Sequence, residues 1–165
     1  MSEVYLRSID RRWKKELETA NGKVTILSPY LTSSTGEAII TKVPSANCEV
    51  YTLFSVENFA SRASSIKTLR KLFDSGYALF HLPRLHAKVV LVSDRLATIG
   101  SQNLTANGIR NREASLLINS QDEVREIEEA LEPWFVERQA ISAEMVSDVE
   151  RLLPQVRRML SLIHI

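Results

Sequence analysis

His86 and Lys88, two residues apart, are the side chains of this sequence best suited to chemistry. They lie in the apolar run HAKVVLVSD, residues 86–94, whose β-branched content predicts a strand. Because side chains alternate along a strand, both would point to one face, roughly 6–7 Å apart along it. An imidazole beside an ammonium in a strand interior is costly in free energy unless an anion lies between them. The pair therefore indicates a site for an anionic group such as a phosphate.

Further polar groups follow along the chain. Residues 100–103, Gly-Ser-Gln-Asn, form a turn rich in hydrogen-bond donors. Glu113 begins the next apolar run, and Arg110 and Arg112 come just before it. A nucleophilic base, a cation, neutral donors and a carboxylate form a set that can process a phosphate ester. The turn residues also suit a plain turn, and Glu113 also suits a surface ion pair with Arg112.

The elements that must position these residues alternate in the first half of the chain. Apolar residues at helical spacing predict helices, and short apolar runs bounded by Pro and Gly predict strands. The predicted helices are 8–20, 35–42 and 59–73, and the predicted strands are 24–30, 49–55 and 77–82. This order is typical of a largely parallel sheet covered by helices.

The second half of the chain changes character. The runs 86–94, 96–101 and 113–119 have short connections, which predicts antiparallel pairing. A helix follows Ser120, whose side chain would cap it, and a last amphipathic helix, interrupted at Pro154, carries apolar residues from 145 to 163. We expect an α/β domain over residues 1–140 and a C-terminal amphipathic helical extension over residues 141–165.

The polar residues resemble the pattern of the phospholipase D superfamily. That pattern is His-x-Lys, an Asp a few residues later, Gly-Ser-x-Asn and a downstream Glu. This chain presents, in the same order and at matching spacing, His86, Lys88, Gly100, Ser101, Asn103 and Glu113. Gly-Ser-x-Asn-x-Thr and Asn-x-Glu follow His-x-Lys in register, which makes the signal specific. The resemblance covers roughly residues 20–135, including Trp134, and implies a phospholipase D-like fold: a mixed, largely parallel sheet flanked by helices.

The resemblance also implies a mechanism. The expected catalytic residues are His86, Lys88, Ser101, Asn103 and Glu113, and the expected substrate-binding residues are Gly100, Arg110 and Arg112. His86 would attack phosphorus to give a covalent phosphohistidine, while Lys88 and Asn103 would stabilise the nonbridging oxygens. Glu113 would hold the other nitrogen of a histidine. No metal or other cofactor is implied, so we expect activity in excess chelator.

The motif occurs once in this chain. In superfamily members with two copies of the motif, the two copies face each other across an internal pseudo-twofold axis. Single-copy members, including small bacterial endonucleases, form dimers instead. Two-fold symmetry would gather both copies of His86 around one axis, giving one active site per homodimer. We therefore expect a metal-independent endonuclease acting on DNA or RNA, with no stable membrane association. A role in a larger defence or repair assembly stays open.

Two other functions remain open. A phospholipid hydrolase or transferase needs an exposed apolar rim, for which residues 104–111 offer only Leu104 and Ile109. A catalytically inactive phosphate-binding or dimerisation module is favoured by one departure from the family pattern. Ser93 stands where the family has its Asp, and Asp94 follows one place later. We expect Asp94 to lie at a hairpin turn with a structural role.

Composition excludes other classes of protein. The 165 residues fit one domain, and 21 Lys and Arg against 20 Asp and Glu give a net charge of +1, so a field that attracts phosphate has to be local. A single cysteine, Cys48, in an apolar run predicts a buried thiol and no intrachain disulfide. No run is apolar enough for a membrane span or a signal peptide, so a cytoplasmic protein is expected. His81 and His164 are expected to have no role in the site.

Overall fold

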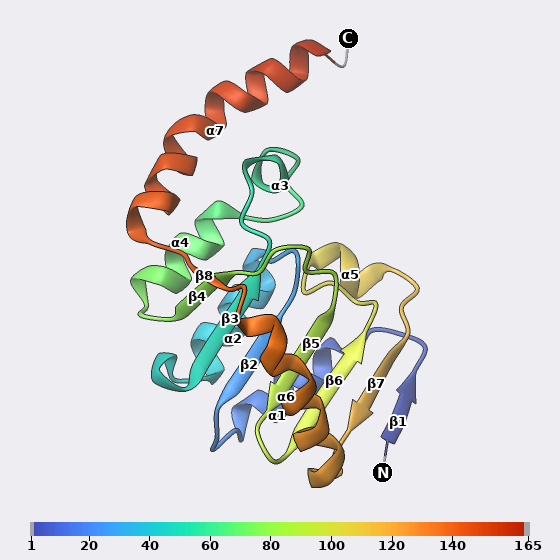
Figure 1. The fold of residues 1–165 in the computed structure, drawn as a ribbon. Helices are drawn as coiled ribbons and strands as arrows, with labels where there is room; N and C mark the ends of the chain where they lie inside the picture. Colours follow the sequence, from blue (N-terminus) through green and yellow to red (C-terminus); the bar gives the residue numbers. More distant parts are fainter. Residues whose placement is uncertain (1, 164–165) are drawn as a thin grey trace.

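An eight-stranded sheet forms the centre of the molecule (Figure 1). The structure is a computed structural model that describes residues 2–163. The strands are β1 (Ser2–Tyr5), β2 (Val24–Leu27), β3 (Cys48–Thr52), β4 (Ala78–His81), β5 (Lys88–Val92), β6 (Leu96–Gly100), β7 (Ser115–Ile118) and β8 (Gln139–Ala140). The α-helices are α1 (Asp10–Glu18), α2 (Ser33–Lys42), α3 (Val56–Ala60), α4 (Ile66–Asp74), α5 (Ala106–Arg110), α6 (Gln121–Phe135) and α7 (Ala143–Ile163).

The strand order across the sheet is β1-β7-β6-β5-β2-β3-β4-β8. β3 pairs in parallel with β2 and β4, and the other pairings between these strands are antiparallel. The predicted mixed α/β class is confirmed, but the sheet is not largely parallel. The connection between β5 and β6 is too short for a parallel crossover. β1 and β8, which the sequence pattern did not predict, add antiparallel edges.

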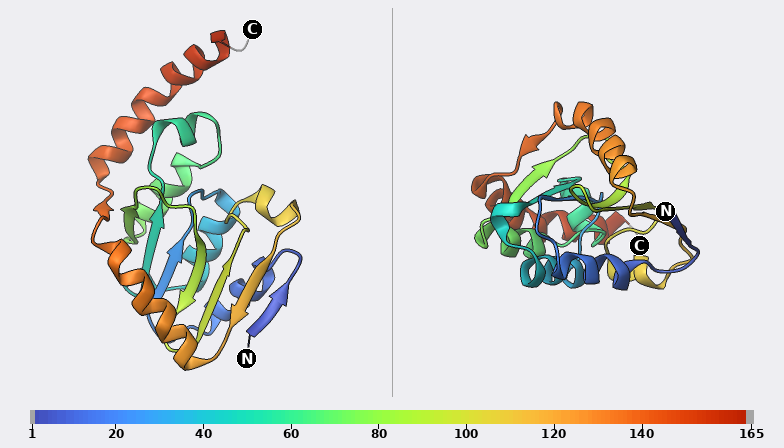
Figure 2. Two further views of the ribbon diagram at one scale, coloured as in Figure 1. Left: turned by 45° about the vertical axis from the view of Figure 1, so that its right-hand side comes forward. Right: turned by 90° about the horizontal axis from the view of Figure 1, so that it is seen from below.

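Helices cover both faces of the sheet (Figure 2). On one face, α1, α2, α4 and the first part of α7 bury Trp13, Leu17, Ile39, Leu69 and Val146 against Ile26, Val50 and Val90. On the other face, α6 buries Val124 and Leu131 against Leu27, Val89 and Leu91. β5 is therefore covered on both sides, which explains why it reads as a continuous apolar run. The start of β5, at Lys88, is therefore fixed by the packed core on both sides of the strand.

The predicted thiol environment is confirmed. Cys48, the first residue of β3, is 2% exposed and lies in the core beneath α2 and α4. Burial raises the pKa of the Cys48 thiol to about 12. The thiol is therefore protonated and inert at neutral pH.

The helix predicted over 59–73 is two helices, α3 and α4. The chain turns between them, with Arg62 in the left-handed region at φ 65°. Ser65 caps α4 by accepting a hydrogen bond from the Thr68 N–H at 3.2 Å. A new helix therefore begins after Ser65, although the spacing of apolar residues continues through this position and predicted one helix. The cap predicted at Ser120 is not formed by its side chain.

The last helix, α7, runs through Pro154 without the predicted interruption. Its first half packs on the core through Val146, Val149 and Leu153. Its second half extends beyond the rest of the molecule (Figure 1), and Met159 and Leu162 are 64% and 72% exposed. Only the first half of the predicted extension is therefore buried against the domain.

Candidate active site

The register of three strands brings the predicted site residues to one end of the sheet. Lys88 of β5 pairs with Gly100 of β6, and Gly100 pairs with Ser115 of β7. His86, residues 101–103 and Glu113 lie next to these three positions along the chain. Groups far apart in the sequence therefore meet because adjacent strands begin or end in one row.

His86 lies in the loop before β5, since the strand begins at Lys88 and not at 86 as predicted. The two side chains nevertheless meet: Lys88 Nζ lies 3.3 Å from His86 Nε2. Lys88 Nζ also donates a hydrogen bond to the His86 carbonyl oxygen at 2.6 Å. His86 is exposed, whereas Lys88 is only 8% exposed. The pair combines an accessible imidazole with a fixed ammonium group.

The electrostatics of Lys88 follow from its burial. Desolvation lowers the pKa of the Lys88 ammonium below its ordinary value, and the negative charge of Glu113 opposes this shift. The carboxylate thus helps to keep Lys88 charged.

Ser101 and Glu113 hold each other across the loop. The Ser101 hydroxyl donates to the Glu113 carboxylate and accepts from the Ala114 N–H at 3.1 Å. Ser101 N–H donates to the Ala114 carbonyl at 3.0 Å. Within residues 2–163 no hydrogen bond joins Glu113 to His86 in one subunit. The role of Glu113 in orienting a histidine stays a prediction.

Asn103 lies in a loop fixed by distant contacts. The next residue, Leu104, donates its N–H to Ser28 Oγ at 3.2 Å and accepts from Thr35 Oγ1 at 2.6 Å. A Cβ on Gly108 would lie 2.1 Å from the Asn103 carbonyl oxygen, so α5 packs directly on this loop. Gly108 lies within α5. Asn103 Oδ1 is buried and has no hydrogen-bond partner in the described part of the chain.

Close packing explains why residue 100 is a glycine. A Cβ at this position would lie 2.3 Å from Ser115 Oγ and 2.5 Å from the Ala114 carbonyl oxygen. The absence of a side chain lets β6 approach the start of β7. This close approach places Ser101 beside Glu113.

The two arginines predicted to bind substrate are at the surface. Arg110 ends α5 and Arg112 follows it, and both are exposed. Neither forms an ion pair within residues 2–163. Their role in substrate binding stays a prediction.

Gln102 is a structural residue that sequence reasoning missed. It is 3% exposed; its Oε1 accepts the Ile9 N–H at 2.8 Å and its Nε2 donates to Ser8 Oγ at 3.1 Å. These contacts span more than ninety positions of sequence. In the sequence, Gln102 is only a polar residue within the turn motif, and this does not reveal that it binds Ile9 and Ser8.

An open cavity of about 470 Å³ lies beside His86. Its lining includes Arg84, Leu85 and the 45% exposed Trp134 at the end of α6. Arg84, in the left-handed region at φ 58°, donates to both carboxylate oxygens of Glu137 at 2.9 and 2.7 Å. The lining of this cavity includes His86 but not Lys88, Ser101 or Asn103.

The family Asp position points away from this cluster. Ser93 donates to Glu128, and Asp94 pairs with Arg125 at 2.7 Å. Asp94 occupies the β5–β6 hairpin at φ 56°, at the opposite end of the strand from Lys88. The expected hairpin position of Asp94 is confirmed, and its side chain takes part in a surface ion pair.

His81, the other histidine among the described residues, is held by the backbone. His81 Nδ1 accepts the Phe54 N–H at 3.1 Å, and His164 lies outside the described residues. Among residues 2–163, no three His, Cys, Asp or Glu side chains gather where they could hold a metal ion. None of the helices in that range is long and apolar enough to cross a membrane.

Fold and site together define an α/β domain with a histidine–lysine pair at one end of a mixed sheet. The family model described as "Cardiolipin synthase, PLD-like domain" matches residues 13–134. The chain belongs to this phospholipase D-like family, whose members are phosphodiesterases. No curated protein matches its sequence.

Solved structures show the same fold. Nuc from Salmonella typhimurium, a phospholipase D family member, has a TM-score of 0.70 at 15% identity over 87% of this chain and 100% of its own. NucT from Helicobacter pylori has a TM-score of 0.66 at 15% identity over 86% and 99%. Phosphatidylserine synthase from Haemophilus influenzae has a TM-score of 0.65 at 14% identity over 99% of this chain and 44% of its own.

Proposed function

We propose that the protein is a metal-independent nuclease that cuts phosphodiester bonds of DNA or RNA through a covalent phosphohistidine. The observation that carries the proposal is the contact of 3.3 Å between Lys88 Nζ and the exposed His86 imidazole. An accessible imidazole nitrogen is a nucleophile for phosphorus. The buried ammonium beside it stabilises negative charge on the phosphoryl oxygens.

The reaction has two steps. A nitrogen of His86 forms a bond to phosphorus, the bond from phosphorus to the leaving oxygen breaks, and a second imidazole protonates that oxygen. Water then gives a proton to the second imidazole and attacks phosphorus, which breaks the phosphorus–nitrogen bond and frees His86. Each subunit holds one histidine of this kind, so the second imidazole is the partner subunit's His86.

The unpaired amide of Asn103 supports a site completed from outside one subunit. A buried polar atom without a partner costs about 1–3 kcal/mol, and Asn103 Oδ1 has none among residues 2–163. Because Oδ1 accepts hydrogen bonds, a donor group of the second subunit would remove this cost, whereas a phosphate oxygen would not. The proposal of a shared site in a homodimer rests on this and on the single motif.

Burial of Leu104 favours a nucleic acid over a lipid. Of the two apolar residues that could have formed a rim for acyl chains, Leu104 is 5% exposed and is fixed in the loop core. Ile109 alone remains on this segment. Only one of the two residues that could form an apolar rim for a lipid is therefore left.

The test is cleavage of labelled single- and double-stranded DNA and RNA in excess EDTA. Wild type should cut at least one polymer, while His86→Ala should lose at least about 10³-fold in rate because the nucleophile is gone. A covalent protein–nucleic acid adduct should form with wild type alone. Cleavage that stops in EDTA would contradict the proposal.

His81→Ala is the matched control, because it removes the other described histidine. Its Nδ1 only accepts a backbone N–H from Phe54, so this variant should keep its cleavage rate once it is folded. Equal losses in both variants would show that His86 acts through folding alone.

One observation favours a second candidate, an inactive nucleic-acid-binding module. Ser93 replaces the family Asp and is occupied by Glu128. TrmBL2, an archaeal chromatin protein with a novel mode of DNA binding, has the same fold at a TM-score of 0.60 and 12% identity over 85% of this chain and 54% of its own. Binding of DNA without cleavage by wild type would favour this candidate.

A further inference from the structure

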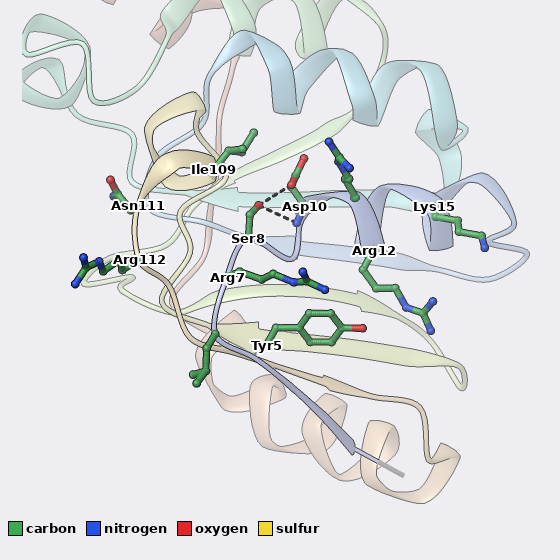
Figure 3. A pocket seen from close by; sticks show the side chains of 11 residues that line it. Tyr5, Arg7, Ser8, Asp10, Arg12, Lys15, Ile109, Asn111 and Arg112 are labelled. Carbon is green, nitrogen blue, oxygen red and sulfur yellow. Dashed lines mark hydrogen bonds between the residues drawn. The ribbon is translucent and has the colours of Figure 1, made fainter.

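A basic groove lies beside the candidate active site. It has a volume of about 800 Å³ and is formed by the segment from β1 to α1 on one side and by Ile109, Asn111 and Arg112 on the other. We define the groove cations as Arg7, Arg11, Arg12, Lys15 and Arg112. Figure 3 shows Arg112 and Lys15 at opposite ends of the groove, with Arg7 and Arg12 between them.

The local charge departs from that of the whole chain. Five basic side chains and one acidic side chain, Asp10, give the groove lining a net formal charge of +4, whereas the chain carries +1. The carboxylate of Asp10 is already held by Ser8 at 2.6 Å and Lys14 at 3.2 Å. The electrostatic field in the groove is therefore positive. Because the whole chain is nearly neutral, a field that attracts phosphate has to be local in this way.

Most groove cations have no ion-pair partner in the described part of the chain. Within residues 2–163, Arg7, Arg11, Lys15 and Arg112 form no ion pair. Arg12 reaches Glu3 and Glu16 only at 3.8 and 3.9 Å, and its Nε is buried without a hydrogen bond. Like charges gathered without partners repel one another, and a polyanion removes that repulsion when it binds.

The shape of the groove selects the kind of anion. The cations extend along a hollow, so they match a row of phosphates better than a single one. A bilayer is flat on this scale and cannot enter the hollow. Tyr5 lines the same groove and offers an aromatic face on which a base can stack. Arginine, four of the five cations, binds phosphate oxygens through two parallel N–H groups.

The groove and the candidate active site share a wall. Gln102, beside Ser101, binds the backbone of Ile9 and the hydroxyl of Ser8, which lines the groove. Arg112 lines the groove next to Glu113. A strand in the groove would therefore be held at a fixed position relative to His86 and Lys88.

We propose that this groove is a separate binding site for the sugar–phosphate backbone of a nucleic acid, away from the bond that is cut. The inference rests on the proposed nuclease function for its substrate class. The groove supplies affinity for a polymer, and the histidine–lysine pair supplies the reaction.

The test is the triple variant R7Q/R11Q/K15Q, which spares Arg112 and Arg12. Binding of labelled 20-nucleotide DNA and RNA is measured by fluorescence anisotropy over a range of salt concentrations, in a His86→Ala background. The triple variant should bind about tenfold or more weakly at 0.1 M salt, and the slope of log K against log salt should fall by about 2. The matched control R62Q/K67Q/R158Q removes the same charge from exposed residues near α7 and should bind as the parent does.

A second readout separates this inference from the proposed function. With His86 intact, the triple variant should hydrolyse bis(4-nitrophenyl) phosphate as fast as wild type, and its KM for the 20-nucleotide polymer should rise without a matching fall in kcat. Unchanged binding and salt slope in the triple variant would overturn the groove, even if cleavage is confirmed. Loss of binding to anionic vesicles instead of nucleic acid would overturn it in favour of a membrane. Weaker polymer binding by a protein that cuts nothing would support the groove and overturn the nuclease.

Discussion

The two central residues of the candidate site differ in their exposure to solvent. His86 is exposed, which allows contact with a substrate, and Lys88 is buried beside it. A charge in a poorly hydrated position acts more strongly on a phosphoryl oxygen than one in water. The same burial lowers the pKa of Lys88, and Glu113 opposes this shift. The active protonation state thus depends on a carboxylate that need not touch the substrate.

Replacing Glu113 with glutamine should move the pH–rate profile. Loss of the negative charge removes what raises the pKa of Lys88, so that pKa falls further and the ammonium deprotonates at lower pH. The alkaline limb of kcat/KM should therefore shift to lower pH, with a fall of about tenfold in rate at neutral pH. The measurement is initial rate against pH on a small phosphodiester.

Glu132→Gln on the exposed face of α6 is the matched control, and it should leave the alkaline limb in place. An alkaline limb that stays in place in Glu113→Gln would show that Glu113 does not act on Lys88. Ser101→Ala, which removes the partner of the same carboxylate, separates the charge of Glu113 from its position.

Among the elements, three antiparallel strands set the geometry of the site. Lys88, Gly100 and Ser115 form one row across β5, β6 and β7. The row requires β6 and β7 to approach closely at Gly100, where a Cβ would lie 2.3 Å from Ser115 Oγ. The glycine of the motif therefore serves the register of the strands.

Gly100→Ala should destabilise the fold and disturb the site together. Backbone at Ala114 and Ser115 would have to move to admit the methyl group, at a cost of about 1–3 kcal/mol in the free energy of unfolding. Urea denaturation measures this cost. Gly22→Ala is the control, because its Cβ would meet nothing nearer than the Ser93 carbonyl oxygen at 3.6 Å. Equal stabilities of the two variants would contradict the packing role of Gly100.

The order of the polar motif predicted most of the candidate site, because strand periodicity and spacing along the chain are local properties. His86 with Lys88 and Ser101 with Glu113 do come together, although the strand begins two residues later than predicted. Contacts between distant segments were not predictable. Nothing in residues 2–5 indicates that they pair with β7, and nothing in Gln102 indicates Ile9.

The element types were also predicted well where packing enforces them. Trp13 and Leu17 on α1 are buried as their helical spacing indicates, and Val89 to Val92 on β5 are all buried, as expected for a continuous apolar run. The break at Arg62 and the helix at Gly108 escaped prediction. The first depends on a serine cap, and the second depends on the contact of α5 with the Asn103 loop.

On the scale of the whole molecule, each chain holds one histidine–lysine pair. The proposed reaction, in which a second His86 protonates the leaving oxygen, needs two chains. Met159, Leu160 and Leu162, in the second half of α7, leave exposed apolar surface that a second copy can cover. The oligomeric state therefore decides whether the proposed chemistry can occur.

Mixing wild type with an equal amount of His86→Ala should test this dependence. If two histidines share one site, exchange of subunits should lower the activity per wild-type chain by about half, because half of the wild-type chains then sit in mixed dimers. Activity is measured before and after exchange, beside a mixture with His81→Ala. Activity per wild-type chain that stays constant would mean that one chain suffices.

The pairing of Lys88 with Gly100 has a consequence for the order in which the molecule forms. The β5–β6 hairpin joins residues only a few positions apart, so its closure costs little chain entropy and can occur early. β1 pairs with β7, and Gln102 with Ile9, across most of the chain, so these contacts close the longest loops. A folding chain should therefore assemble the lysine and its strand neighbours before the N-terminal segment arrives. The groove, which needs that segment, would be completed last.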